Sequence, residues 1–186
     1  MNRKGLWANL AVKLVLVGLL LFSVFSDLER FSGKAMTARA LTYPVAALVV
    51  PIVWWLRGRR RPYPHAIDVL VVLPFVIDTG GNVADLYSVW WFDDVAHFLN
   101  WWILVSAVAL ALRRTALGPS VSWCLAVGFG AVTEILWELG EYTVMKLGSS
   151  GLQLTYVDTI GDLALGGGGT LLGASLVSAA WKLSRT

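Results

Sequence analysis

The chain has 186 residues, of which 57% are hydrophobic and 15% are charged, and this composition excludes an ordinary soluble domain. The net charge of +3 does not indicate nucleic-acid binding, because basic residues in a membrane chain mostly reflect topology. The single cysteine, Cys124, excludes an intrachain disulfide and a cysteine-based metal site. The length fits one integral membrane domain over residues 1–186.

Apolar residues fall in six blocks separated by short charged stretches. A block of about 20 residues is long enough for a helix to cross about 30 Å of hydrocarbon. The third block is short, carries Asp68 and Pro74, and is expected to stop at Asp78, so by itself it also fits a re-entrant segment. The predicted helices cover approximately residues 6–25, 39–56, 66–77, 94–112, 121–142 and 157–181.

Basic residues predict the orientation of these helices. The loops at 57–61 and 113–114 both belong in the cytoplasm by the positive-inside rule, so an even number of crossings separates them and the third block spans. Lys13, inside the first helix, is expected to reach the cytoplasmic interface with its long side chain. Ten of the 15 basic residues are then cytoplasmic: Arg3, Lys4, Arg57, Arg59, Arg60, Arg61, Arg113, Arg114, Lys182 and Arg185.

We therefore predict an all-α fold, a polytopic membrane protein with a bundle of six transmembrane helices and both termini cytoplasmic. The predicted location is a membrane that the chain crosses several times, with the basic loops on the cytoplasmic side. Four consecutive glycines, residues 166–169, fall in the sixth helix, where glycine usually lets a neighbouring backbone approach closely. We interpret them as a packing surface.

Acidic residues are distributed unevenly in this topology. Eleven of the 12, all but Asp68, lie in or near the outer half. A carboxylate at mid-membrane costs about 2.5 to 3.5 kcal/mol, and facing like charges add to that cost, so a cation, shared protons or water must offset it. Helical spacing places acids on one face of each of the last three helices: Asp93 or Asp94 with His97; Glu134, Glu138 and Glu141; Asp158 and Asp162.

A structural interpretation of the acids also stands. Asp93 or Asp94 and Asp158 begin helices, where a carboxylate caps free N–H groups. Glu138 and Glu141 are near a helix C-terminus, where the dipole opposes negative charge, so capping does not explain them. A purely structural network would pair acids with the outer basic residues, which are Arg30, Lys34, Arg39 and Lys146.

The strings DVAHF at 94–98, ELGEY at 138–142 and DTIGDL at 158–163 carry a resemblance to a known family. The chain resembles the YjdF-like bacterial inner-membrane proteins and, more distantly, the VanZ-like family linked to glycopeptide resistance. The resemblance covers residues 93–174, the expected site-bearing core. It implies site positions at Asp94, His97, Glu138, Glu141, Asp158 and Asp162; Glu134 is an addition of this chain.

Three functional hypotheses follow. The first is a metal-dependent hydrolase or transferase acting on a lipid-linked or amphipathic substrate, with His97, Glu138 and Glu141 as catalytic candidates. One histidine with many carboxylates suits a divalent ion such as Mg, Mn, Ca or Zn. The expected ligands are Asp94, His97, Glu134, Glu138, Glu141, Asp158 and Asp162.

The second hypothesis is a proton- or cation-coupled transporter or sensor, and the third is a membrane scaffold with an acidic outer face. A scaffold predicts acids on loops rather than on helix faces. The expected partners are membrane lipid and a lipid-linked substrate, and no nucleic acid is expected. A homo-oligomer also stays open, because six helices leave little room for the two gates of a transporter and a second copy would enlarge the bundle.

Overall fold

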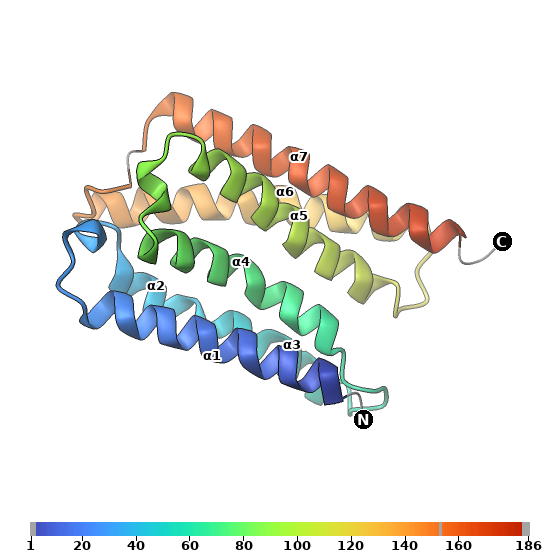
Figure 1. The fold of residues 1–186 in the computed structure, drawn as a ribbon. Helices are drawn as coiled ribbons and strands as arrows, with labels where there is room; N and C mark the ends of the chain where they lie inside the picture. Colours follow the sequence, from blue (N-terminus) through green and yellow to red (C-terminus); the bar gives the residue numbers. More distant parts are fainter. Residues whose placement is uncertain (1–2, 153, 184–186) are drawn as a thin grey trace.

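The computed structural model describes residues 3–152 and 154–183, and this part of the chain is helical without strands. Six helical segments are long and apolar enough to cross a membrane, which confirms the predicted fold class, and the chain is a multi-pass membrane protein. The elements, shown in Figure 1, are α1 (Arg3–Phe25), η1 (Glu29–Phe31), α2 (Met36–Thr42), α3 (Pro44–Leu56), α4 (His65–Val83), η2 (Leu86–Ser88), α5 (Phe92–Leu112), α6 (Pro119–Lys146) and α7 (Tyr156–Leu183).

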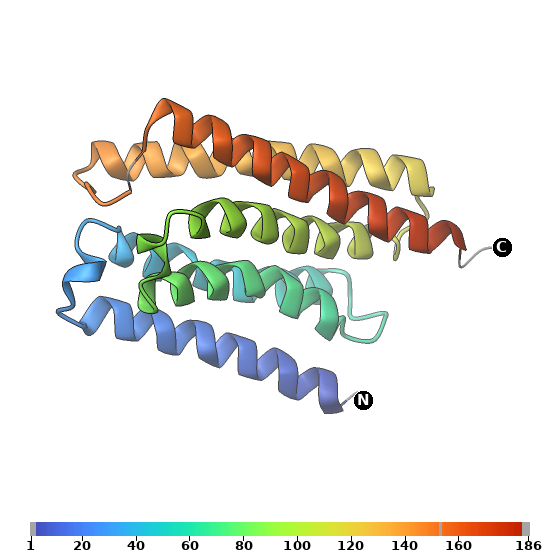
Figure 2. The ribbon, with the colours of Figure 1, turned by 45° about the horizontal axis from the view of Figure 1, so that its top comes forward.

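The helices run along one common direction, so all loops lie at two ends of the bundle (Figures 1 and 2). The start of α1 and the end of α7 lie at the same end, as six crossings require. In the turned view, α6 and α7 form one side, α1 forms the other, and α3, α4 and α5 lie between them. The packing order is α1 on α4, α4 on α5, and α7 on both α5 and α6.

The second span is divided into α2 and α3. Pro44 has no N–H and begins α3, so the hydrogen-bond ladder is interrupted there. Tyr43 keeps right-handed helical geometry, and its N–H still donates to the Arg39 carbonyl at 2.9 Å. The two pieces therefore count as one span, Met36–Leu56, with Arg39 and Tyr43 in its first half.

The third span is longer than predicted. The expected stop at Asp78 was wrong, because α4 continues through Thr79, Gly80, Gly81 and Asn82 to Val83. The polar side chains find partners inside the bundle: the Thr79 hydroxyl donates to the Phe75 carbonyl at 2.8 Å, and the Asn82 amide donates to the Asp78 carbonyl at 3.0 Å. With 19 residues, α4 is long enough to span.

Glycines on α7 allow close packing, as the sequence predicts. A β-carbon at Gly169 or Gly173 would meet backbone atoms of Phe98 or Trp102 on α5. At Gly166 it would overlap the side chain of Glu134 on α6. Three glycine positions thus let α5 and α6 approach α7 closely.

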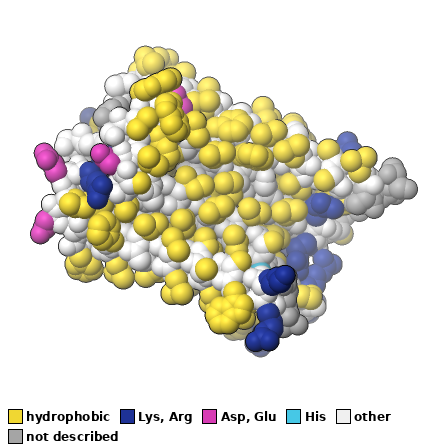
Figure 3. Space-filling model, in the orientation of Figure 1, with side chains coloured by type: hydrophobic (Ala, Val, Ile, Leu, Met, Phe, Trp, Pro, Cys, Tyr) yellow, Lys and Arg dark blue, Asp and Glu magenta, His cyan; other side chains and the backbone are white. Residues whose placement is uncertain are grey.

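Charge separates the two ends of the bundle. On the face in Figure 3, most arginine and lysine atoms gather at the end where the chain termini lie, and acidic atoms gather at the opposite end. We call the end that holds the loops 57–64 and 113–118 the basic end, and the end that holds η1 and η2 the acidic end. The positive-inside rule predicts that the basic end is cytoplasmic.

Lys13 has an ion-pair partner on α4 that was not expected from the sequence. Its ammonium Nζ lies 2.7 Å from Oδ2 of the fully buried Asp68 on α4, and the Tyr63 hydroxyl donates to the same oxygen. The attraction between the Lys13 ammonium and the Asp68 carboxylate is strong because both lie in surroundings of low dielectric constant. His65, the first residue of α4, is half-buried and packs on Tyr63 with ring centroids 4.7 Å apart.

Two loops at the acidic end are joined through their backbones. The Gly151 N–H, between α6 and α7, donates to the Gly33 carbonyl at 3.1 Å. Gly33 has φ +70°, in the left-handed region that favours glycine. A β-carbon at either glycine would lie within 2.9 Å of the opposite loop, so only hydrogen fits at both positions.

Candidate functional site

His97 forms the centre of an acidic cluster where α5 and α7 begin, at the acidic end of the bundle. Its Nε2 lies 3.8 Å from a carboxylate oxygen of Asp93, one turn earlier on α5, and 3.8 Å from a carboxylate oxygen of Asp162 on α7. One ligand atom from each of the three residues lies within 4.8 Å of the others. His97 and Asp162 are buried, whereas Asp93 is half-exposed.

The His97 ring is held by aromatic packing. It stacks on the Trp101 indole, one turn further along α5, with centroids 5.6 Å apart and planes 5° apart. The Trp101 Nε1–H donates to the Gly130 carbonyl of α6 at 3.1 Å. His97 Nδ1 is buried and has no hydrogen-bond partner within the described residues. The packing therefore fixes the plane of an imidazole whose second nitrogen is unsatisfied.

A cavity of about 620 Å³ opens beside this cluster. At the acidic end it is lined by Asp93, Asp94, His97 and Asp158. Away from that end its walls become apolar and are formed by residues of α3, α4, α5 and α6. These apolar lining residues include Val45, Val49, Val71, Leu104, Val108 and Phe129.

The structure brings together part of the predicted site. Asp94 and Asp158 line the cavity, but Asp93, not Asp94, joins His97 and Asp162 in the tightest group. Helical spacing alone allowed either aspartate. Glu141 also lines the cavity, where its Oε1 lies 3.9 Å from an Arg39 guanidinium nitrogen, so this glutamate faces a basic partner.

Glu134 and Glu138 lie deeper, on the face of α6 that meets α7. Both are buried, with 2% and 7% of their surface exposed. Neither Glu138 oxygen makes a hydrogen bond of good geometry within the described residues, although Thr159 and Asp158 are neighbours. Glu134 Oε1 is also unpaired there. Neither glutamate has an ion-pair partner in that part of the chain.

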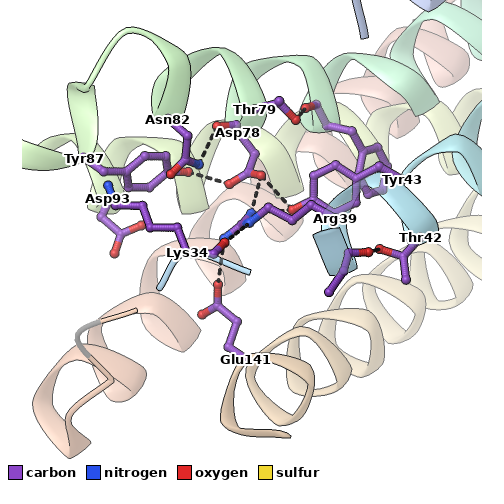
Figure 4. A network of polar contacts seen from close by, with 12 residues as sticks. Lys34, Arg39, Thr42, Tyr43, Asp78, Thr79, Asn82, Tyr87, Asp93 and Glu141 are labelled. Carbon is purple, nitrogen blue, oxygen red and sulfur yellow. Dashed lines mark hydrogen bonds and ion pairs between the residues drawn. The ribbon is translucent and has the colours of Figure 1, made fainter. Parts of the chain in front are cut away.

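The polar network in Figure 4 agrees in part with the structural interpretation of the acids, because Arg39, one of the outer basic residues, pairs with a carboxylate, although the sequence did not indicate which one. Arg39 of α2 and Asp78 of α4 form a buried ion pair. The Tyr43 hydroxyl donates to Asp78 Oδ2 at 2.6 Å, and the Tyr87 hydroxyl donates to Oδ1 at 2.8 Å. The Arg39 Nε–H donates to the Lys34 carbonyl at 3.1 Å. This network joins the second and third spans beside the cavity.

Helix capping differs from the expectation at two positions. The Asp158 N–H donates to the Thr155 hydroxyl at 3.1 Å, so Thr155 caps α7 and Asp158 lies in its first turn. Trp91 occupies the N-cap of α5 without a side-chain hydrogen bond, and Asp93 and Asp94 follow in the first turn. The helix dipole still favours these carboxylates.

Lys34 and Tyr87 lie outside the spans, at the aqueous rim of the cavity. The Lys34 ammonium lies 5.5 Å from the centroid of the Tyr87 ring. Burial lowers the pKa of Lys34 below its usual value of 10.5, and nearby Asp85 partly opposes this effect. Burial and the charge of Asp78 raise the pKa of Tyr87 well above 10.0.

Comparison with known proteins gives one match. A family model described as "Predicted membrane protein (DUF2238)" matches residues 8–183, almost the whole chain. The chain belongs to this family. It is the family of the YjdF-like proteins, so the resemblance seen at residues 93–174 is confirmed and extends to the first three spans. The comparisons do not show the more distant likeness to the VanZ-like family. No curated protein and no solved structure matches.

The donor set of the cluster fits a divalent cation. Two ligands on opposite sides of an ion, each about 2.1 Å from it, are about 4.2 Å apart. The separations here, up to 4.8 Å, need only small side-chain rotations to reach that value. One imidazole nitrogen with two carboxylates suits Mn or Zn best, whereas Mg and Ca prefer oxygen ligands alone.

Proposed function

We propose that this protein is a membrane-embedded, metal-dependent hydrolase or transferase that acts on a lipid-linked or amphipathic substrate at the outer face of the bacterial cytoplasmic membrane. One observation carries the proposal: the Asp93, His97 and Asp162 cluster lies beside a cavity of about 620 Å³ that continues between apolar helix walls. Polar chemistry and an apolar binding surface thus occur within a single space.

The shape of this cavity supports an amphipathic substrate. Val45 and Val49 of α3 and Phe129 of α6 line the cavity and are also exposed on the bundle surface, where they would face lipid. A substrate could then keep its chain in the apolar part while its polar group lies near His97. Moving an acyl chain out of water contributes about 0.8 kcal/mol per CH₂. A lipid-linked substrate has already gained this free energy by entering the membrane, so the membrane, rather than the cavity, accounts for most of the affinity that the acyl chain provides.

The proposed roles follow from position. Asp93, His97 and Asp162 would hold the cation, which would supply a Lewis acid and an activated water. Asp94 and Asp158 line the cavity beside them and are candidates for accepting a proton. Lys34, also in the lining, is suited to an anionic group on the substrate, whereas Arg39 is already paired with Asp78. Glu138 and Glu141, the other two catalytic candidates from the sequence, would have supporting roles. Glu138 is buried with both of its carboxylate oxygens unpaired within the described residues, and Glu141 faces Arg39.

Metal analysis of protein purified without chelator tests the cation directly. We expect about one divalent ion per chain in the wild type and loss of that ion in His97→Ala and Asp162→Asn. Glu29→Gln is the matched control, because Glu29 is an exposed acid on η1 away from the cavity. Wild type without stoichiometric metal, or metal retained in both cluster variants, would contradict the proposal.

A second candidate function is a proton- or cation-coupled carrier. Glu134 and Glu138 favour it, because two buried carboxyl groups without cationic partners extend from the cluster into the span. Proton flux into proteoliposomes separates the two functions: a carrier loses flux in Glu134→Gln and keeps it after metal removal. A scaffold is less favoured, because Glu134, Glu138 and Asp162 are buried and present no outer surface.

A further inference from the structure

A second cavity, of about 710 Å³, lies at the basic end, 57–64 and 113–118, away from the acidic cluster. It is bounded by α3, the loop after α3, α4 and α5. The arginines in its lining are Arg57, Arg60, Arg61 and Arg114. The remainder of the lining is mostly apolar, for example Val53 and Ile67.

Charge in this cavity is of one sign. No Asp or Glu is among its lining residues within the described chain. The nearest acid in the sequence, Asp68, is fully buried and is already occupied by Lys13 and Tyr63. Four arginines around one space therefore repel each other unless an anion neutralises them.

Two of these arginines are held in place. Arg61 Nη1 donates to the Arg114 carbonyl at 2.7 Å, and Arg114 Nη2 donates to the Pro62 carbonyl at 3.0 Å. A guanidinium has five N–H donors, so each arginine retains donors for a further acceptor. The two bonds join the loops after α3 and after α5 and bring their guanidinium groups into one pocket.

We infer that this cavity binds an anionic phospholipid of the membrane leaflet at the basic end, with the phosphate at the arginines and an acyl chain along the apolar wall. Charge complementarity indicates a phosphate, which guanidinium groups bind well. The apolar wall includes Val53, Ile67 and Ala111, which lie on membrane-spanning helices and offer no contact that a free phosphate ion needs. The inference does not depend on the proposed enzymatic function.

Native mass spectrometry of detergent-solubilised protein titrated with dioleoyl-phosphatidylglycerol tests this site, with dioleoyl-phosphatidylcholine as the neutral comparison. We expect tighter binding of phosphatidylglycerol and a loss of at least about tenfold in affinity for each of Arg60→Gln, Arg61→Gln and Arg114→Gln, because a hydrogen bond to a charged group contributes about 1.5 kcal/mol or more. Arg59→Gln is the matched control: Arg59 is exposed in the same loop but does not line the cavity.

Two further arms test the acyl chain. Ala111→Phe, which fills the apolar wall without changing charge, should weaken phosphatidylglycerol binding, and glycerol phosphate should compete at least about a hundredfold less well than the lipid. Arg60 is an exposed loop residue, so its variant stays informative if Arg114→Gln does not fold. Equal binding of the two lipids, an equal loss in Arg59→Gln, no effect of Ala111→Phe, or efficient competition by glycerol phosphate would each overturn the inference.

Discussion

The Glu134 carboxyl of α6 lies so close to Gly166 of α7 that a β-carbon at position 166 would overlap it. Gly166→Ala should therefore destabilise the protein by about 1 to 3 kcal/mol, the usual cost of overpacking. At Gly167 a β-carbon would meet nothing within 4 Å, so Gly167→Ala should be neutral or stabilising. Thermal unfolding in detergent measures both. Equal effects of the two substitutions would contradict the contact, and Glu134→Ala should restore part of the stability of Gly166→Ala.

Asp78 carries the network between the second and third spans, so its charge is important for stability. Asp78→Asn should destabilise the protein by up to about 3 to 5 kcal/mol, because it removes the nearer counter-ion of the buried Arg39 and leaves only Glu141, 3.9 Å away. Asp85→Asn, an exposed change two residues after α4 ends, should have little effect. Unfolding of both variants in the same detergent measures the difference, and similar unfolding curves would contradict a stabilising pair.

Glu138 tests whether a cation explains the buried acids. If a bound ion offsets their cost, chelator should destabilise the wild type by up to about 2.7 kcal/mol at a free metal concentration a hundredfold above Kd. Glu138→Gln should then be at least as stable as the metal-free wild type, because a neutral amide relieves repulsion. Unfolding with and without chelator measures both. If chelator has no effect while Glu138→Gln is strongly destabilised, the glutamate belongs to a structural network.

The rim lysine predicts a pH dependence. Because the pKa of folded Lys34 is lowered below 10.5, the folded protein releases this proton before the unfolded chain does. Stability should therefore rise with pH in the window below 10.5. Tyr87, with its pKa raised above 10.0, contributes stability that is lost only at higher pH. Melting temperatures between about pH 8 and pH 9.5 should rise more in the wild type than in Lys34→Met; parallel profiles would contradict the effect.

Orientation in the membrane follows from the positive-inside rule and is tested by labelling. In a Cys124→Ser background, Ser150→Cys at the acidic end should react with an impermeant maleimide added to intact cells. Arg60→Cys at the basic end should react only after lysis. Ser150 and Arg60 are both exposed, so access within the fold does not limit either reaction. The reverse pattern would place the acidic cluster in the cytoplasm.

The six spans could be predicted because hydropathy and charge are local properties of the sequence. Side-chain partners could not, because they depend on how spans pack. Asp78 precedes Thr79 and two glycines, a composition typical of a turn, yet Arg39 from another span lets the helix continue. Arg39 and Tyr43 are one helical turn apart in the second span, and this spacing was the one feature of the sequence that indicated a polar face on that span. Similarly, spacing allowed either Asp93 or Asp94 beside His97, and only the rotation of α5 against α7 selects Asp93.

The hydrogen bond from Gly151 to Gly33 has a consequence for the dynamics of the acidic end. It links loops that are far apart in the sequence, one after the first span and one before the last, and Gly151 itself lines the cavity. Neither loop can move outward without breaking this bond, so the aqueous rim opens as one unit rather than loop by loop. The exchange rate of a single amide, that of Gly151, therefore reports how often water gains wide access to the cavity from this side.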